Sequence, residues 1–320
     1  MSFSRSKDPE TAVLITVCVP TFRRPELLRK LLAGVAKQEK GSLFSLEVIV
    51  VDNDRNRSAQ GVVEDFNASG TIPARYLVEP VQNISLARNM ALDNARGDFI
   101  AFIDDDEWPT PHWLGNLLKT LRLYDADGVL GPVLPHFDSD PPRWLIRGGF
   151  CDRPRHKTGS LLPSGQTRTG NVLFTARLTR NRMNRFLPEF GRSGGEDIEF
   201  FRGLIGQGRR FVWCDEAEVY ETVTEDRWTR RFYLKKYFRL GSLNGEKARG
   251  RAGKRGLVLK SMTAWVFYTA ALPFSPLLGF HRFMKCLTLF LYHLGTVLGF
   301  SGLVLIRYRD NADKENMADI

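Results

Sequence analysis

The sequence predicts an α/β protein built on a mostly parallel sheet with helices on both faces. Over roughly the first 130 residues, apolar runs rich in β-branched residues alternate with stretches whose apolar residues recur every three or four positions. Such regular alternation is typical of strands joined by crossover helices. A second observation supports this fold. Polar residues directly follow three predicted strands, and ligands of parallel sheets bind at the carboxyl ends of the strands.

The expected strands cover residues 13–19, 46–51, 75–78, 99–103, 128–134 and 210–215. The expected helices cover residues 25–35, 62–66, 85–95, 113–124 and 196–206. In the first helix the apolar residues are spaced at i, i+3, i+4 and i+8, which indicates one buried face. Ser85 is expected to cap the third helix. Residues 135–195 are rich in Pro, Gly and Arg and predict mobile loops and short elements over the site.

The strand at 99–103 ends in four consecutive acids, residues 104–107. Acids crowded in this way repel one another, and they are tolerated where a cation lies between them. Asp104 and Asp106 are two positions apart, so both can reach one hard divalent cation, which prefers oxygen ligands. Alternatively, one acid caps a following helix whose first turn would hold Pro109. Capping needs a single acid, so the run of four favours a metal site.

The overall charge and the cysteines limit the possible classes of protein. The net charge of +10 permits nucleic acid, anionic lipid or phosphorylated ligands. The four cysteines lie far apart without a CxxC spacing, which argues against a zinc site and a disulfide framework and fits a reducing compartment. Residues 1–12 are expected to be disordered and contain no apolar core typical of a signal peptide, so we expect the catalytic part in the cytoplasm. Neither GxGxxG nor GxxxxGK[ST] occurs, and the five histidines are scattered.

The C-terminal third is basic and then hydrophobic. Residues 227–239 interleave Arg and Lys with aromatic residues, and a basic linker is expected over 244–256. Residues 257–308 are hydrophobic and are expected to associate with a membrane, followed by a polar tail over 309–320. A hairpin in the cytoplasmic leaflet, two membrane spans and two core helices all remain possible. The basic turn between the two apolar stretches disfavours two spans.

The basic aromatic stretch at 227–239 has three possible ligands. It could bind nucleic acid, anionic lipid, or the phosphates of a donor and a lipid-linked acceptor. Its nearness to the hydrophobic segment favours the latter two. Nothing in the chain resembles a nucleic-acid-binding module, so we expect no nucleic-acid partner.

Five strings of residues occur in an order and spacing that together identify a family. They are Val19-Pro20-Thr21-Phe22-Arg23-Arg24, Val50-Val51-Asp52-Asn53, Leu86-Ala87-Arg88-Asn89-Met90-Ala91, Ile103-Asp104-Asp105-Asp106 and Gly195-Glu196-Asp197. The set resembles the family 2 glycosyltransferases of GT-A fold, over about residues 13–240. Within the family, the chain looks most like the ExoM-type enzymes of succinoglycan biosynthesis, which build bacterial exopolysaccharide. The processive QxxRW motif is absent after the acidic pair, which favours the addition of one sugar per visit.

The resemblance implies a nucleoside-diphosphate sugar as donor, most simply a UDP-sugar, and a divalent metal, Mg²⁺ or Mn²⁺. It assigns donor binding to Pro20, Thr21, Arg23, Asp52, Asn53, Arg88, Asp104 and Asp105. Asp52 would accept hydrogen bonds from the base or ribose, and Asp105 would point toward the sugar. Arg88 would offer a forked cation near the metal strand, although a surface ion pair is its alternative. Asp106, assisted by Asp104, would hold the metal against the diphosphate.

The resemblance also assigns the catalytic base to the Gly195-Glu196-Asp197 string, with Asp197 preferred over Glu196. A carboxylate within reach of the acceptor hydroxyl can remove its proton as the new bond forms. The two glycines before the pair allow the backbone to approach a sugar closely. Alternatively, both acids complement the dipole at the start of a helix. One displacement by a general base predicts inversion at the anomeric carbon.

We therefore expect a metal-dependent, inverting glycosyltransferase that moves one sugar to a lipid-linked glycan, polyprenyl-linked for example, at the cytoplasmic face of the plasma membrane. Residues 13–243 would form the GT-A domain, divided into a nucleotide-sugar half at 13–134 and an acceptor half at 135–243. The alternatives are a nucleotidyltransferase on a similar sheet and a non-catalytic protein that binds a membrane surface.

Overall fold

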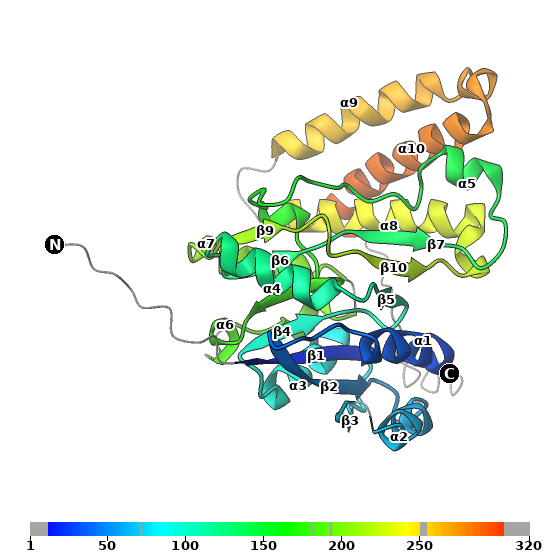
Figure 1. The fold of residues 1–320 in the computed structure, drawn as a ribbon. Coiled ribbons are helices and arrows are strands. Elements are labelled where there is room, and N and C mark those ends of the chain that lie inside the picture. Colours follow the sequence, from blue (N-terminus) through cyan, green and yellow to red (C-terminus); the bar gives the residue numbers. More distant parts are fainter. Residues whose placement is uncertain are drawn as a thin grey trace, which may run out of the picture. The chain divides into compact units, whose positions relative to one another are not determined.

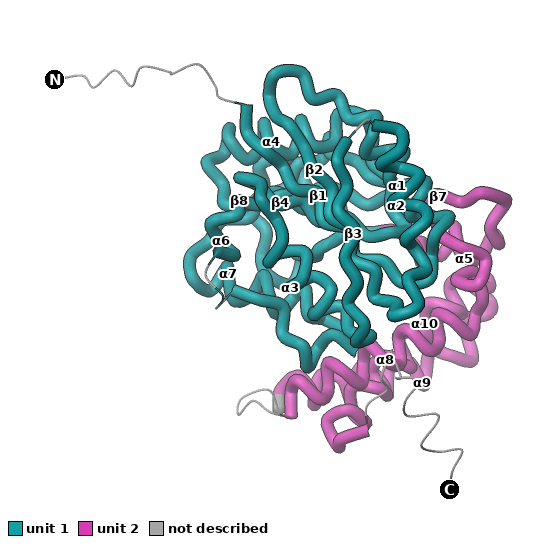
Figure 2. Tube along the Cα trace, turned by 90° about the horizontal axis from the view of Figure 1, so that it is seen from below, with its two compact units in different colours: residues 1–134, 153–221 teal, residues 135–152, 222–320 magenta. Residues whose placement is uncertain are grey.

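The computed structural model describes residues 12–70, 72–180, 182, 184–192, 194–249 and 255–303. The disorder expected over 1–12 and the polar tail expected over 309–320 therefore lie outside the described residues, except for Ala12. The chain forms two compact units (Figure 2). Unit 1 comprises residues 1–134 and 153–221, and unit 2 comprises residues 135–152 and 222–320.

Unit 1 contains a seven-stranded sheet (Figure 1). In sheet order, its strands are β3 (Ala74–Val78), β2 (Phe44–Asp52), β1 (Val13–Thr21), β4 (Phe99–Phe102), β8 (Val172–Thr175), β6 (Gly128–Leu130) and β9 (Phe211–Trp213). Strand β8 runs antiparallel to both of its neighbours, whereas every other pairing in the sheet is parallel. The mostly parallel sheet predicted from the alternating pattern is confirmed.

Helices cover both faces of this sheet, as predicted. They are α1 (Pro25–Ala36), α2 (Gln60–Ala68), α3 (Ile84–Asn94), α4 (Trp113–Leu123), α6 (Arg177–Arg180) and α7 (Glu196–Gly206), with 3₁₀ turns η1 (Ser164–Gln166) and η2 (Pro188–Phe190). Successive side chains of a strand point to opposite faces, so Val17 and Cys18 of β1 belong to different core clusters. Helices α1, α2 and α4 bury their apolar residues in one cluster, and α3 and α7 bury theirs in the other.

Two local predictions were wrong. The strand expected over 128–134 is split, because β6 ends at Leu130 and β7 (Val133–His136) lies in a second sheet of order β5–β10–β7. Pro132 between them has no N–H to donate. The other strands of this sheet are β5 (Glu107–Pro109) and β10 (Val219–Thr222).

The second wrong prediction is the cap of helix α3. This helix is capped by Asn83, whose side chain accepts from the backbone N–H of Ser85, whereas the Ser85 hydroxyl donates to the Leu187 carbonyl oxygen.

Unit 2 is mostly helical. Its helices are α5 (Arg143–Arg147), α8 (Arg230–Arg249), α9 (Arg255–Ala271) and α10 (Phe280–Phe300), with 3₁₀ turns η3 (Glu225–Trp228) and η4 (Ser275–Leu278). The predicted hydrophobic hairpin exists as α9 and α10. Of the basic linker expected over 244–256, the residues up to Arg249 are helical in α8 and those from Arg255 belong to α9, and residues 250–254 lie outside the described part of the chain. Leu145, Phe150, Tyr233 and Met284 form a small core in this unit.

Helices α8 and α10 approach each other through glycines. A Cβ added at Gly241 or Gly245 of α8 would overlap carbonyl oxygens of Tyr292 or Thr296 on α10. Likewise, a Cβ at Gly295 or Gly299 of α10 would overlap carbonyl oxygens on α8. Each helix therefore carries two glycines four positions apart at the contact, a spacing common where membrane helices pack closely. This contact is why the helix continues through the segment expected to be a linker.

Among the described helices, α10 alone is long and apolar enough to cross a membrane, and about a third of its apolar window is buried. The four cysteines are all free thiols.

Candidate active site

The predicted donor residues meet at one edge of the seven-stranded sheet. Thr21 at the end of β1 pairs in register with Asp52 at the end of β2, and Cys18 pairs with Phe102 at the end of β4. These three strands run parallel, so the acidic run after Phe102 emerges at the same edge as Thr21 and Asp52. The sheet topology therefore brings together three motifs that are far apart in the sequence.

Asp52 and Asn53 organise the loops at this edge. The Asp52 carboxylate is fully buried and accepts hydrogen bonds from the backbone N–H groups of Asp54 (3.0 Å) and Ala59 (2.8 Å) and from the Tyr76 hydroxyl (2.8 Å). Asn53 donates to the carbonyl oxygens of Glu79 and Val81. Both side chains thus position the loops that would surround a nucleotide, and their direct contact with the base or ribose stays a prediction.

Asp105 points inward, toward the end of β1. One of its oxygens accepts from the Thr21 hydroxyl at 2.9 Å, and the other accepts from the Arg24 guanidinium at 3.0 Å. Burial, opposed by Arg24, raises the pKa of Asp105 to about 6. In this structure Asp105 therefore links β1 to the acidic run. Its orientation toward the sugar stays a prediction. Pro20, which precedes Thr21 in β1, is also buried.

Arg24 is a site residue that the sequence reasoning did not single out. It also donates to Asp106 at 3.1 Å, so one guanidinium contacts two carboxylates of the acidic run. Its neighbour Arg23 binds Asp54 through two nitrogens, at 3.0 and 3.4 Å, and adopts a left-handed backbone with φ of 54°. This sharp turn sends the two arginines to different partners. The Thr21-Phe22-Arg23-Arg24 string was the only sequence signal for Arg24.

Arg88 connects the acidic run to the predicted catalytic pair. Its guanidinium donates to Asp104 at 3.3 Å and forms a short ion pair with Glu196. Arg88 is 5% exposed, and the two carboxylates hold its pKa above the ordinary value despite its burial. The alternative of a surface ion pair is therefore wrong. Asn89, the next residue of α3, donates to the carbonyl oxygen of Phe186 and accepts from its N–H.

Glu196 and Asp197 begin α7 and differ in their surroundings. Gly194 and Gly195 precede them with φ values of 92° and 90°, a backbone that favours glycine. Glu196 is buried against Arg88, whereas Asp197 is only half-buried and accepts from the N–H of Ile198 at 2.8 Å. Burial and then the Glu196 carboxylate raise the pKa of Asp197 to about 6, against the opposing effect of Arg88. Asp197 is therefore the more accessible carboxylate of the two.

A second buried charge network adjoins the acidic run and was also missed. Glu107 is 1% exposed, accepts from the Asp104 N–H at 3.2 Å and lies 3.8 Å from Arg153, which forms a short ion pair with Glu221. Burial and then Asp104 raise the pKa of Glu107. A Cβ at Gly170 would lie 2.6 Å from a Glu107 oxygen, so a larger residue there would displace this carboxylate.

Arg168 completes this network. Burial and then the nearby Arg153 lower the pKa of Arg168 to about 10, so the guanidinium stays charged at neutral pH. Its Nε is buried and has no hydrogen-bond partner among the described residues. The field of Asp197 acts on Arg168 as well. A buried donor without a partner is costly, so the Arg168 Nε is a candidate hydrogen-bond donor for a bound ligand.

The donor set fits a divalent metal shared with a diphosphate. Within the described part of the chain, no group of three or more His, Cys, Asp or Glu side chains could hold a metal ion. Mg²⁺, however, commonly takes one or two carboxylates and completes its shell with water and phosphate oxygens. Asp104, with its side chain 40% exposed, and Asp106 supply such a pair. In this structure the Arg24 guanidinium contacts Asp106, so a metal would share or replace that contact.

The sheet, the edge loops and the acidic clusters define the class of protein as a glycosyltransferase of GT-A fold. The family model "Glycosyl transferase family 2" matches residues 16–186, which is more than half of the chain. The chain therefore belongs to glycosyl transferase family 2, as the five strings predicted.

Several known proteins are similar to the chain. The succinoglycan biosynthesis protein ExoM of Rhizobium meliloti is 37% identical over 303 residues, covering 92% of this chain and 95% of that protein. A Campylobacter jejuni GalNAc(5)-diNAcBac-PP-undecaprenol beta-1,3-glucosyltransferase is 31% identical over 115 residues, covering 36% of this chain and 35% of that protein. Among solved structures, S. aureus TarS 1-349 in complex with UDP-GlcNAc has a TM-score of 0.53 and 17% identity, covering 90% and 92% of the two chains.

Proposed function

We propose that the protein transfers one sugar from a UDP-sugar to a lipid-linked glycan during bacterial exopolysaccharide biosynthesis, with inversion at the anomeric carbon. The observation that carries this proposal is the position of Asp197. It is a half-buried carboxylate with a pKa of about 6 in the first turn of α7. The first residue of this helix, Glu196, forms an ion pair with Arg88, which also forms an ion pair with Asp104 of the acidic run. The Arg88 side chain would then connect the helix that carries the base, Asp197, to the acidic run where the leaving diphosphate would bind.

Donor binding would use the edge of the sheet. The loops that Asp52 and Asn53 hold in place would surround the base and ribose, with Pro20, Thr21 and Arg23 beside them. Asp104 and Asp106 would hold Mg²⁺ or Mn²⁺, and the bound metal would neutralise charge that develops on the leaving diphosphate. The cationic Arg24 and Arg168 lie in the same region and would bind further phosphate or sugar oxygens.

Asp197 would accept the proton of the acceptor hydroxyl as that oxygen attacks the anomeric carbon. With a pKa of about 6, the carboxylate is mostly ionised at neutral pH and is a stronger base than an ordinary aspartate. Glu196 would keep Arg88 in place and thereby hold the base near the donor. Because a single displacement by an oxygen nucleophile reverses the configuration, the product would be inverted.

The lipid-linked acceptor is supported by two observations. The C. jejuni relative, by its name, acts on an undecaprenol-linked glycan, and the ExoM relative takes part in succinoglycan biosynthesis. In addition, unit 2 carries the apolar helix α10 and a set of exposed apolar residues on α9 and η4. We propose that unit 2 attaches the enzyme to the cytoplasmic face of the plasma membrane, where such an acceptor resides.

A donor panel tests the proposal. The purified full-length protein is incubated with UDP- and other nucleoside-diphosphate sugars, with Mg²⁺, with Mn²⁺ or with EDTA, and the released nucleotide is identified. We expect metal-dependent release of a nucleoside diphosphate. Release of pyrophosphate would identify a nucleotidyltransferase instead, and the absence of any turnover with every donor would support a non-catalytic membrane-binding protein.

A further inference from the structure

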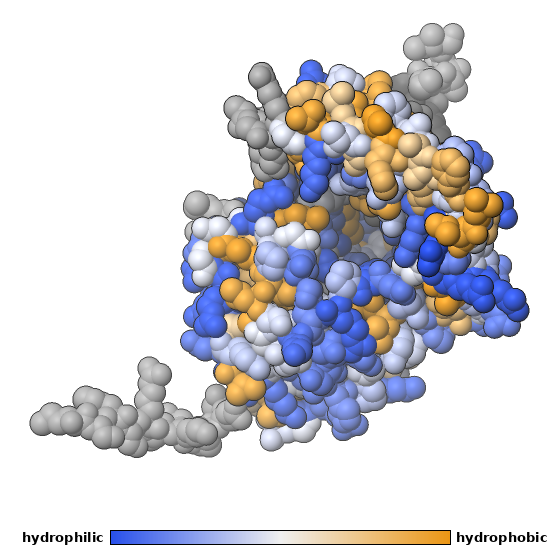
Figure 3. Space-filling view, turned by 90° about the horizontal axis from the view of Figure 1, so that it is seen from above, coloured by the Kyte–Doolittle hydropathy of each residue, from blue (hydrophilic) through white to orange (hydrophobic). Residues whose placement is uncertain are grey.

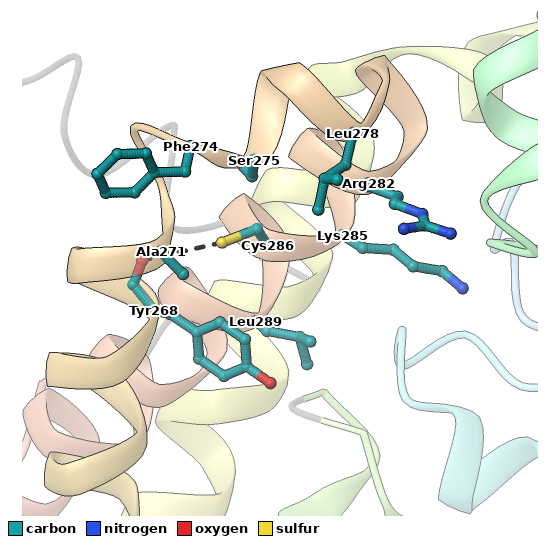
Figure 4. A pocket seen from close by; sticks show the side chains of 9 residues that line it. All are labelled: Tyr268, Ala271, Phe274, Ser275, Leu278, Arg282, Lys285, Cys286 and Leu289. Atoms are coloured by element: carbon teal, nitrogen blue, oxygen red, sulfur yellow. Dashed lines mark hydrogen bonds between the residues drawn. The ribbon is translucent and has the colours of Figure 1, made fainter.

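Unit 2 contains a cavity of about 350 Å³ between α9, η4 and α10 (Figure 4). Its walls are almost entirely apolar and include Tyr268 and Ala271 of α9, Leu278 of η4 and Leu289 of α10. The Cys286 side chain also lines the cavity, and its thiol donates a weak hydrogen bond to the Tyr268 carbonyl oxygen at 3.8 Å. A volume of this size lies within the range of sites that hold small ligands.

Two cations stand at the rim of this cavity. Arg282 and Lys285 lie three positions apart on α10, both are exposed, and Figure 4 shows their side chains extending to the same side of the helix. Residues three apart on a helix are neighbours on its surface. The structure records no ion pair for either side chain among the described residues, and residues 255–303 contain no Asp or Glu at all. The rim therefore offers an anionic group two positive charges for which the described residues show no ion pair.

The surface around the cavity is apolar. Within residues 255–303, nine large hydrophobic residues are between 41% and 84% exposed: Leu259, Met262, Val266, Phe267, Phe274, Leu277, Leu278, Phe280 and Leu303. Figure 3 looks onto the molecule from the side of α9 and shows apolar side chains beside strongly polar ones on that face. Exposed apolar residues on helices that also carry basic residues are typical of helices that lie in the interface of an anionic bilayer.

We propose that this cavity binds one anionic phospholipid of the bilayer, with its phosphate between Arg282 and Lys285 and part of one acyl chain among the apolar walls. The segment expected to be a basic turn is helical, because Arg282 and Lys285 lie in the first two turns of α10. These two cations favour this occupant, because basic residues at the end of an apolar helix stay on the cytoplasmic side at the level of the lipid phosphates. A hairpin lying flat in that leaflet has its cations at phosphate level and its apolar residues in the acyl layer. The proposal rests on the membrane attachment proposed above and not on the transfer reaction.

Lipid binding to the full-length protein in detergent tests the rim. Phosphatidylglycerol is titrated, and the bound lipid is counted by native mass spectrometry. We expect one lipid per chain. Arg282→Gln and Lys285→Gln together should lower the affinity about 30-fold, or about 2 kcal/mol, at about 1 kcal/mol per cation near lipid phosphates. Lys260→Gln is the matched control. This cation lies eight residues before Tyr268, about 12 Å along α9, and should change the affinity by less than about twofold.

A charge-neutral variant tests the cavity itself. Ala271→Trp would fill the space and should also abolish retention of the lipid, while circular dichroism and binding to vesicles of phosphatidylcholine stay unchanged. Retention of one phosphatidylglycerol by both the double variant and Ala271→Trp would overturn the proposal. Displacement of phosphatidylglycerol by a small molar fraction of undecaprenyl phosphate would also overturn it, because the cavity would then hold the acceptor's carrier. Hydrolysis of the sugar donor is measured in parallel and tests the transferase proposal independently of lipid binding.

Discussion

The guanidinium of Arg88 on α3 forms a buried ion pair with Glu196, 108 positions later at the start of α7. The same guanidinium reaches Asp104 after β4. One side chain therefore joins the acidic run to the acidic pair across one face of the sheet. A change at Arg88 should consequently alter both stability and catalysis.

Removing Arg88 should be strongly destabilising. Arg88→Met leaves Glu196 buried without its cation, and breaking a buried pair on one side costs about 3 to 5 kcal/mol. Glu196→Gln in the same chain should restore much of this loss, because the uncompensated charge disappears. Urea unfolding of the four variants of the cycle measures the coupling. The half-exposed pair Arg185–Asp93 serves as control and should give a coupling below about 1 kcal/mol. Equal couplings for the two pairs would contradict the structural role of Arg88.

Asp197→Asn should lose turnover but keep donor binding. General-base catalysis typically contributes about 10² to 10⁴ in rate, so we expect a loss in that range with little change in the KM for the donor. Donor affinity can be measured by calorimetry in the presence of metal. An effect confined to Glu196→Gln would move the base by one residue, and a lost donor affinity with unchanged turnover would refute the role.

The pH dependence of turnover follows from the same carboxylate. Burial raises the pKa of Asp197 from 3.8 to about 6, and the ionised form is the active base. Turnover at saturating donor should therefore rise as the pH increases through about 6 and then level off. The Asp197→Asn variant should lack this rise. If both proteins show the same ascending limb, another group titrates and Asp197 is not the base.

Asp106→Ala should abolish transfer and weaken metal-dependent donor binding while the fold stays intact. A loss of more than about tenfold, or about 1.4 kcal/mol, is expected because Asp106 is one of only two proposed protein ligands. Asp65→Ala, which removes an exposed carboxylate of α2, is the matched control and should leave activity unchanged. Nearly full activity of Asp106→Ala would assign the acidic run to holding Arg24 and the loops rather than a metal.

The contact between α8 and α10 should be intolerant of a single methyl group. Gly245→Ala would drive a Cβ into the backbone of α10, and overpacking of this kind costs about 1 to 3 kcal/mol. Gly203→Ala, in the open surroundings of α7, should instead be neutral or stabilise the protein by up to about 1 kcal/mol. Thermal unfolding of both variants makes the comparison. Equal stability of the two would show that the helices do not pack through these glycines.

The sequence predicted most of the sheet and that the candidate site residues meet at one of its edges, because periodic apolar patterns and strand-end acids are local signals. It could not predict the partners of the charged residues. Asp105 turns toward Thr21 and Arg24, and Glu107 joins Arg153 and Glu221, through contacts between segments far apart in the chain. The helical state of residues 244–249 was missed for the same reason. Glycines lower the helix propensity locally, and only the contact with α10 compensates for them.

The glycine contact between α8 and α10 has a practical consequence for anyone wishing to handle this enzyme without detergent. A chain shortened after Arg249 keeps α8 but loses the helix against which its two glycines pack. Such a truncation removes the apolar surface of α9 and α10, but it exposes the glycine face of α8 that packed against α10. The shortened chain would therefore expose a new surface that is prone to aggregation. A water-soluble variant is better obtained by resurfacing α9, for example with polar residues at Leu259, Val266 and Phe267, which leaves the α8–α10 pair whole.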